Sequence, residues 1–230
     1  MSAPLLVCRP EPGASATAAA ARLLGLLPVV APLFHVEALA WDAPAPDRFD
    51  ALMMTSANAA RHAGSALGLY ARLPAFAVGA ATAAAMREIG LFPEVGAAGA
   101  AALAAEIAAR AHRRVLHLCG EHRVSPDFAD LSVHPVPVYR VIAADALPPA
   151  AAGAIAAGAV VLLHSPRAAS LFARLIDDGG WGRANQRLVA ISPAAAEAAG
   201  RGWRSVDAAP APTDAAMLAI AGKLCENAPR

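Results

Sequence analysis

Short apolar runs alternate with longer alanine-rich segments along most of the chain, and this alternation constrains the fold more than any single motif. Apolar runs stand at residues 5–8, 51–54, 160–163 and 188–191. Strands that are apolar throughout, separated by amphipathic helices of about 10–15 residues, are typical of parallel sheets covered on both faces. The pattern therefore predicts an α/β protein. The other expected strands are 28–31, 76–78 and 115–118, and the expected helices are 14–24, 57–67, 82–89, 101–111, 168–176, 194–199 and 215–224.

The strand–helix pattern occurs twice, as an internal repeat. The segment at residues 52–67, LMMTSANAARHAGSAL, is similar to LLHSPRAASLFARLI at residues 162–176. The unit that follows each segment also matches, residues 76–95 with residues 188–206. A repeat of about half the chain favours a duplication over a solenoid, so we expect two α/β domains of similar build, each with a parallel sheet.

Two connectors suggest how these domains are joined. Residues 34–49 and 137–149 each begin with a strand-like stretch and end in a proline-rich one. The simplest arrangement inserts a domain of residues 38–142 into a discontinuous domain of residues 1–37 plus 143–230. Two extended strands would then join the domains and leave a cleft between them, where a ligand would bind.

Charge and cysteine content exclude several classes of protein. The 230 residues hold 19 basic and 18 acidic side chains, without the basic excess of a nucleic-acid-binding protein. The uncharged stretch at residues 146–165 contains Pro148, Pro149, Gly153 and Gly158, which argue against a membrane span. The N-terminus lacks the features of a signal peptide, and three cysteines favour reduced thiols. We therefore expect a cytoplasmic monomer.

Signatures of metal and cofactor sites are absent from the sequence. His117, Cys119 and His122 could be imagined as metal ligands, but no second ligand pair follows at the spacing of a zinc site. The chain contains no P-loop, no GxSxG and no GxGxxG motif. The sequence thus predicts neither a metal nor a cofactor.

Small polar residues recur where a strand ends and a helix begins. Thr55 with Ser56, Gly79 with Thr82, Ser165 and Ser192 all occupy such positions. One interpretation is N-capping, which these residues serve in many proteins. The other is ligand binding, because these loops line the carboxyl edge of a parallel sheet and free amides at helix starts bind anionic groups. The set favours a ligand with several carboxylates or phosphates.

With these positions in view, the chain resembles the uroporphyrinogen-III synthase family. The resemblance runs nearly from end to end and rests on the order and spacing of generic elements. They are LLVCRPEPG near the start, TSANA at 55–59, VGAATAAAM at 78–86, VLHLCGEHR at 115–123, VYR at 138–140, HSPRAASLF at 164–172, AISPAAAEAA at 190–199 and APTDAAML at 211–218.

The resemblance implies two α/β domains, one inserted in the other, and a cofactor-independent lyase of tetrapyrrole and heme biosynthesis. The implied substrate is hydroxymethylbilane, a linear tetrapyrrole with acetate and propionate carboxylates. The reaction loses water, inverts the terminal pyrrole ring and closes the macrocycle as uroporphyrinogen III. Such an enzyme must hold a flexible chain in a reactive conformation.

The resemblance also assigns roles to residues. Tyr139 would be the catalytic proton donor, since a phenol is protonated at neutral pH and can protonate a leaving hydroxyl. Its alternative role is that of an aromatic side chain packed in the wall of the site. Arg9, Arg123, Arg140 and Arg167 are candidates for charged contacts to carboxylates, or else solvated surface arginines. The full set of expected substrate-binding residues is Arg9, Pro10, Thr55, Ser56, Asn58, Gly79, Ala80, Thr82, Gly120, Arg123, Arg140, Ser165, Arg167, Ser192 and Ala194.

Two alternative functions remain open at this point. The chain could be a non-catalytic two-domain protein that binds a small anion, or an inactive paralogue of the synthase. Formation of the type III isomer from hydroxymethylbilane would separate the synthase from both alternatives.

Overall fold

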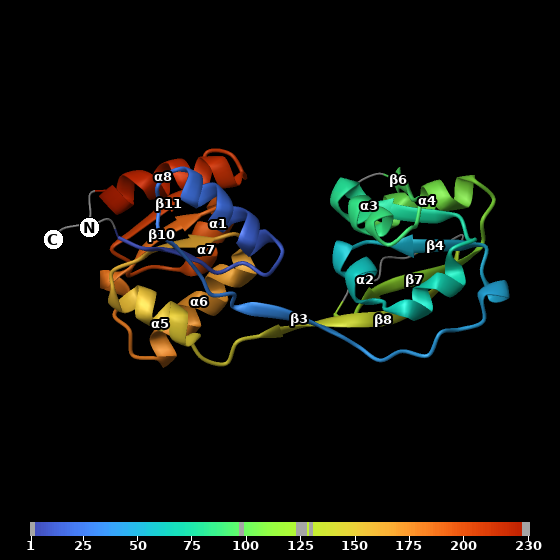
Figure 1. Cartoon of the computed structure of the whole chain (residues 1–230), viewed down its shortest axis with the longest axis horizontal. Helices are drawn as coiled ribbons and strands as arrows, with labels where there is room; N and C mark the ends of the chain where they lie inside the picture. The colour runs from blue at the N-terminus through green and yellow to red at the C-terminus, as the bar shows by residue number, and fades with distance from the viewer. Residues whose placement is uncertain (1–2, 97–98, 123–127, 129–130, 227–230) are drawn as a thin grey trace. The chain divides into compact units, whose positions relative to one another are not determined.

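The computed structural model describes residues 3–96, 99–122, 128 and 131–226. The chain divides into two compact units, which we call unit 1 (Met1–His35 with Ile142–Arg230) and unit 2 (Val36–Val141). The chain crosses between the units within β3 (Phe34–Ala38) and within β8 (Ser132–Ala143), which are adjacent strands of one sheet (Figure 1).

Unit 1 is built around a parallel sheet. Its strands are β1 (Leu5–Val7), β2 (Pro28–Val30), β9 (Val160–Leu163), β10 (Arg187–Ala190) and β11 (Ser205–Ala208), and its helices are α1 (Gly13–Leu23), α5 (Pro149–Ala156), α6 (Pro166–Asp178), α7 (Pro193–Ala199) and α8 (Asp214–Glu226). The strand order is β11-β10-β9-β1-β2, and each pair of neighbouring strands runs parallel. The carboxyl ends of these strands therefore share one edge.

Helices cover both faces of the unit 1 sheet. Side chains of α1 and α8 pack with Leu5, Val7, Val160 and Leu162 on one face, and α5 and α6 lie on the other (Figure 1). All residues of β1 and β9 are buried. Burial on both faces explains why these strands are apolar at every position instead of at alternate ones.

Unit 2 contains the second sheet, with strand order β3-β8-β7-β4-β5-β6. Besides β3 and β8, its strands are β4 (Ala51–Met54), β5 (Ala75–Val78), β6 (Glu94–Gly96) and β7 (Arg114–Gly120). Its α-helices are α2 (Ala57–His62), α3 (Gly79–Glu88) and α4 (Ala100–Ala109). Unit 2 also has the short 3-10 helices η1 (Pro46–Arg48) and η2 (Ser65–Tyr70), and a third one, η3 (Arg183–Asn185), belongs to unit 1. Strands β8, β7, β4, β5 and β6 pair in parallel.

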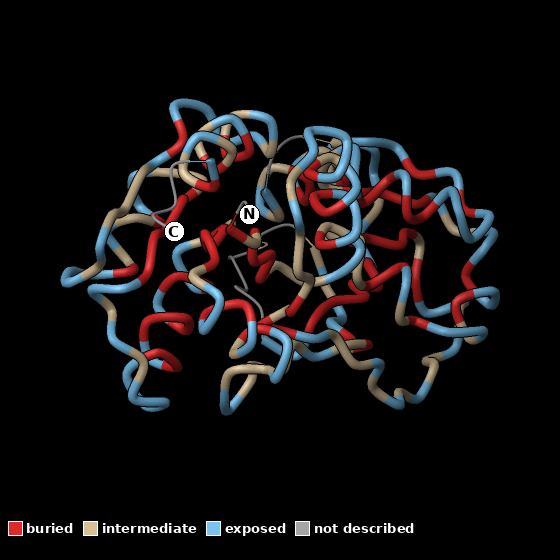
Figure 2. The backbone as a smooth tube through the Cα atoms, turned by 60° about the vertical axis from the view of Figure 1, so that its left-hand side comes forward, coloured by how far each residue is buried: buried red, intermediate tan, exposed pale blue. Residues whose placement is uncertain are grey.

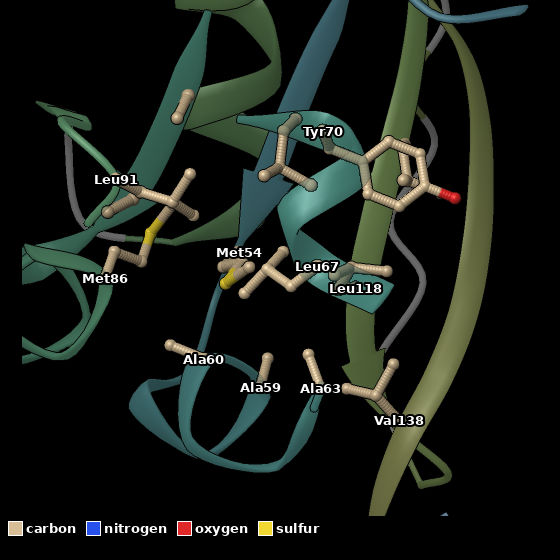
Figure 3. Close-up of a cluster of buried hydrophobic side chains, with 14 of the residues drawn as sticks. Met54, Ala59, Ala60, Ala63, Leu67, Tyr70, Met86, Leu91, Leu118 and Val138 are labelled. Carbon is tan, nitrogen blue, oxygen red and sulfur yellow. The ribbon is translucent and has the colours of Figure 1, made fainter. Parts of the chain in front are cut away.

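Figure 3 shows the larger core of unit 2, on the face covered by α2 and α3. Met54 of β4, Leu118 of β7 and Val138 of β8 meet Leu67 and Met86 from the helical layer. On the opposite face, side chains of α4 pack with Met53 and Phe76. In Figure 2 the buried stretches lie inside each unit and the exposed stretches on its outside.

These observations confirm the predicted α/β fold with two parallel-sheet domains. The expected helix at residues 57–67 begins where predicted but ends early, because α2 stops at His62 and η2 begins at Ser65. Between them Gly64 has φ +68°, a left-handed conformation that interrupts a right-handed helix. No helix within the described residues is long and apolar enough to cross a membrane.

Candidate functional site at the carboxyl edges of the two sheets

The predicted site residues of unit 2 gather at the carboxyl edge of its sheet. Thr55 follows β4, Gly79 follows β5 and Gly120 ends β7. These strands are neighbours in the order β8-β7-β4-β5, and Tyr139 lies on β8 opposite Gly120. The topology therefore brings together residues that are up to eighty-four positions apart in sequence.

Tyr139 is held by the backbone on which it lies. The register between β7 and β8 shifts between Cys119 and Gly120, and the Glu121 amide donates to the Tyr139 carbonyl at 2.9 Å. The half-buried ring packs against the core of unit 2, with its centroid 6.3 Å from that of His62. The Tyr139 hydroxyl makes no hydrogen bond to a residue that the structure describes. The ring is thus positioned while its hydroxyl is left available to a ligand.

Two of the predicted hydroxyls at this edge, those of Thr55 and Ser56, have partners inside the protein. Thr55 Oγ1 lies 3.2 Å from Nε2 of His117, and Ser56 Oγ accepts from the Asn58 amide at 3.2 Å as the N-cap of α2. The Thr82 side chain is buried in α3, whereas Ala80 is exposed at the start of that helix. Burial lowers the pKa of His62, with a smaller contribution from Arg61, so this imidazole is neutral at neutral pH.

The carboxyl edge of the unit 1 sheet carries a cluster that the sequence did not reveal. Arg9, two residues beyond β1, pairs with Asp214 at 3.0 Å between Nη1 and Oδ1, although the residues are 205 positions apart. Thr17 of α1 donates its hydroxyl proton to Asp214 Oδ2 at 2.5 Å. We call Arg9, Thr17, His164 and Asp214 the Asp214 cluster.

His164 completes the Asp214 cluster from the end of β9. Its side chain is 5% exposed, and Nε2 lies 3.4 Å from Asp214 Oδ1 without the geometry of a hydrogen bond. Burial and the positive charge of Arg9 lower the pKa of His164 to about 4, against the opposing effect of Asp214. His164 is therefore neutral at neutral pH, and Arg9 is the cation that pairs with Asp214.

The other predicted arginines have partners of their own. Arg140 donates from Nε at 3.1 Å and from Nη2 at 2.9 Å to Oε2 of Glu37. The Arg167 guanidinium lies over the Phe34 ring, with 4.7 Å from Cζ to the ring centroid. Arg123 lies outside the described residues. Arg140 and Arg167 remain exposed, so the partners orient these side chains without burying them.

The serines of unit 1 act as helix caps. Ser165 Oγ accepts from the Ala168 amide at 3.1 Å, and Ser192 Oγ accepts from the Ala195 amide at 3.3 Å. Pro10 is half-buried and Ala194 is exposed in the first turn of α7. The capping interpretation thus describes both hydroxyls, which leaves backbone amides rather than serine side chains as the groups open to a ligand.

Two pockets lie away from the predicted residues. A pocket of about 340 Å³ is lined by residues of α2, η2 and the end of α3, and one of about 300 Å³ lies at the amino edge of the unit 2 sheet beside Arg48 and Arg114. Among the described residues, no three His, Cys, Asp or Glu side chains are grouped so as to hold a metal ion.

Sequence reasoning missed Thr17, His164 and Asp214 as site residues. His164 and Asp214 both lie in segments on which the resemblance was based, HSPRAASLF and APTDAAML. The available signal was position: His164 directly follows a buried strand, and Asp214 opens the helix after the last strand. Nothing in the sequence, however, indicates that the two meet Arg9.

The chain is similar to a known protein family and to known structures. The family model described as uroporphyrinogen-III synthase HemD matches residues 15–219. The solved structure of uroporphyrinogen-III synthetase from Helicobacter pylori 26695 is 17% identical, with a TM-score of 0.65 over 96% of this chain and 99% of that one. A mutant uroporphyrinogen III synthase from the extremely thermophilic bacterium Thermus thermophilus is 19% identical, with a TM-score of 0.50 over 98% of this chain and 100% of that one.

No curated protein sequence is significantly similar to the chain. At these identities the two solved structures show a shared fold, and the family assignment rests on the family model, which matches most of the chain. Two parallel-sheet α/β units, the order of the matched segments and this model lead to one conclusion: the chain belongs to the uroporphyrinogen-III synthase family.

Proposed function

We propose that Tyr139 is the proton donor of this synthase and that loops at the carboxyl edge of each sheet bind the carboxylates of its substrate. As a member of its family, the chain is a cyclising hydro-lyase that acts on a tetrapyrrole, converting hydroxymethylbilane to uroporphyrinogen III. The reaction releases one water, so the departing hydroxyl needs a proton. The observation that carries the proposal is the position of Tyr139. Its ring packs closely against Gly120, and its hydroxyl makes no hydrogen bond to any residue that the structure describes.

The chemistry of a phenol suits this step. Tyr139 would give its proton to the terminal hydroxyl of the substrate as the carbon–oxygen bond breaks, and the bond's electron pair would leave with the water. The proton that the substrate releases when the macrocycle closes would restore the phenol. General acids contribute about 10²–10⁴-fold to such steps. Orientation of the flexible substrate would supply the rest of the acceleration.

Substrate binding would use many weak donors instead of a few buried charges. The expected contacts are backbone amides near Thr55, Gly79, Gly120, Ser165 and Ser192, supplemented by arginine side chains. Gly79 has φ +74°, so the chain turns there in a way that a side chain would disfavour, directly at the start of α3. Carboxylates are favoured at such helix starts because the amide protons point at them.

We also propose that the enzyme works as a cytoplasmic monomer without a cofactor. The three cysteines are free and buried, as expected for reduced thiols in the cytoplasm.

The test is a coupled assay that supplies hydroxymethylbilane and separates the isomers of the product. We expect the wild-type chain to give the type III isomer, and Tyr139→Phe to lower kcat by about 10²-fold with little change in KM. Tyr70→Phe is the matched control, because Tyr70 is buried and its hydroxyl donates to the Pro44 carbonyl at 2.6 Å.

Each other outcome has a definite meaning. Unchanged turnover of Tyr139→Phe would remove Tyr139 from the acid role. Formation of only the type I isomer by the wild-type chain, as in the uncatalysed reaction, would instead indicate a non-catalytic anion-binding protein or an inactive paralogue.

A further inference from the structure

One carboxylate ties together three separate elements at the edge of the unit 1 sheet. Asp214, the first residue of α8, contacts Arg9 after β1, Thr17 of α1 and His164 after β9. Its oxygens are divided between partners: Oδ1 faces Arg9 and His164, and Oδ2 accepts from Thr17. An aspartate in the first turn of a helix also lies at the positive end of the helix dipole, where a negative charge is favourable.

The Arg9 guanidinium is confined on two sides. Nη1 is 3.0 Å from Asp214 Oδ1 and 3.4 Å from Thr17 Oγ1. The other side lies against Gly13, where an added Cβ would be 2.5 Å from Nε and 2.9 Å from Nη2. Glycine at position 13 is therefore required for this close approach. An arginine held this way has already lost most of the rotamer freedom that binding would otherwise remove.

The Asp214 cluster is partly open to solvent. Thirty-two per cent of the Arg9 side chain and 30% of the Asp214 side chain are exposed, whereas His164 is 5% exposed. The buried imidazole of His164 lies beside Oδ1 of Asp214, with 3.4 Å between Nε2 and that oxygen. About a third of the Arg9 and Asp214 side chains is therefore open to solvent, while their neighbour His164 is buried.

From this arrangement we infer that Asp214 is a positioning residue that holds Arg9 in the orientation in which it takes up a substrate carboxylate. The inference rests on the proposed function, since it assigns Arg9 to the substrate. Arg9 donates from Nη1 to Asp214 and Thr17. A guanidinium has five N–H donors, so those on Nε and Nη2 remain for a second carboxylate. Asp214 acts through Arg9 and does not itself touch the substrate.

A double-mutant cycle on Arg9 and Asp214 tests the inference. We expect Asp214→Asn, which keeps the shape and removes the charge, to raise KM for hydroxymethylbilane about three- to tenfold with kcat changed less than about twofold. In an Arg9→Ala background, Asp214→Asn should change KM no further, because the residue through which it acts is gone. Asp178→Asn is the matched control: it also removes a carboxylate from unit 1, but from a side chain that is 61% exposed and paired with Arg174.

Several results would overturn the inference. A KM unchanged or lowered in Asp214→Asn would mean that Asp214 is structural or competes with the substrate for Arg9. Equal effects of Asp214→Asn with and without Arg9 would mean that it acts elsewhere. If Asp214→Asn does not fold, the test uses Thr17→Val, which removes the hydroxyl that donates to Asp214. We expect this variant to raise KM by less than Asp214→Asn would, and an unchanged KM would contradict the inference. Failure of the proposed function would look different, since the wild-type chain itself would then make no type III isomer.

Discussion

The Tyr139 ring covers Gly120 so closely that no side chain fits at position 120. A Cβ there would lie 2.9 Å from Cζ of Tyr139 and 3.0 Å from its hydroxyl oxygen. Gly120 is not among the residues of positive φ, so this approach, and not backbone conformation, is what requires a glycine. The contact joins the end of β7 to the proposed proton donor on β8.

Gly120→Ala should therefore displace the phenol without removing it. The backbone of Tyr139 is fixed by the sheet, so the ring must tilt away from the new methyl group. Misplacement of a reacting group by about 1 Å can cost about 10²-fold in rate. We expect kcat to fall by between about 10-fold and 10²-fold, measured by type III isomer formation. Gly153→Ala in α5 is the control, because nothing lies within 4 Å of its added Cβ. The Gly153→Ala variant should keep the wild-type kinetics and gain up to about 1 kcal/mol of stability. A Gly120→Ala enzyme with wild-type kcat would contradict the role that we give to the contact between Gly120 and Tyr139.

The buried His164 should make stability depend on pH. Its pKa is about 4 in the folded protein because of burial and Arg9, whereas an unfolded histidine has a value of 6.5. The unfolded chain therefore binds more protons below pH 6.5, and the free energy of unfolding falls as the pH drops from 6.5 towards 4. The loss is on the order of 3 kcal/mol. Urea titrations across this range should show that His164→Gln lacks this part of the slope. The control, replacement of the exposed His122 by Gln, should retain the pH dependence of the free energy of unfolding. If His164→Gln and the wild type show the same dependence, His164 is not its source.

Ser165 allows helix capping to be separated from ligand binding. Ser165→Ala should lower the free energy of unfolding by about 1 kcal/mol, because the Ala168 amide loses its acceptor. Ser165→Asp should retain the stability, since aspartate caps as well as serine, but its charge should repel the substrate carboxylates that we expect there. A rise in KM for Ser165→Asp with wild-type thermal stability is the predicted result. An unchanged KM would remove this loop from the substrate site.

The three cysteines should be unreactive in the folded protein. Cys8, Cys119 and Cys225 are all buried, and burial raises the pKa of Cys8 to about 12. Because the thiolate is the reactive form, a disulfide reagent at pH 8 should label the native chain slowly. In guanidinium chloride it should titrate three thiols per chain, the number in the sequence. Rapid labelling of native Cys8 would show that the end of β1 opens readily.

Much of the fold could be predicted because local pattern and burial agree. The runs at 51–54 and 160–163 coincide with β4 and β9, whose residues are all buried. The prediction omitted α5, where proline and glycine on a uniformly apolar background hid the helix. It also omitted the three-residue strand β6, which lies at the edge of its sheet and contains one charged and one glycine residue. Edge strands bury little, so they leave a weak pattern.

The site was less predictable, because its contacts depend on the tertiary structure. Sequence placed Arg9 at the end of a strand, but not within reach of Asp214. The sequence left both capping and ligand contacts open for the serines, and the structure shows Ser165 and Ser192 accepting from the amides of Ala168 and Ala195. Tyr139 was identified by the family resemblance alone. Its packing over Gly120 depends on a register shift between β7 and β8 that no local motif encodes.

The two crossings within β3 and β8 have a consequence for engineering. Unit 2 is one uninterrupted stretch of sequence, and both of its ends lie in adjacent strands of its own sheet. A gene fragment for residues 34–143 would thus encode an entire sheet with its helices, carrying Tyr139 but neither Arg9 nor Asp214. If the two remaining stretches, residues 1–33 and 144–230, were joined by a short linker, they would form a second polypeptide that corresponds to unit 1. The proposed acid, Tyr139, and the proposed carboxylate ligand, Arg9, could then be produced in separate polypeptides. This makes the chain a candidate for a split enzyme.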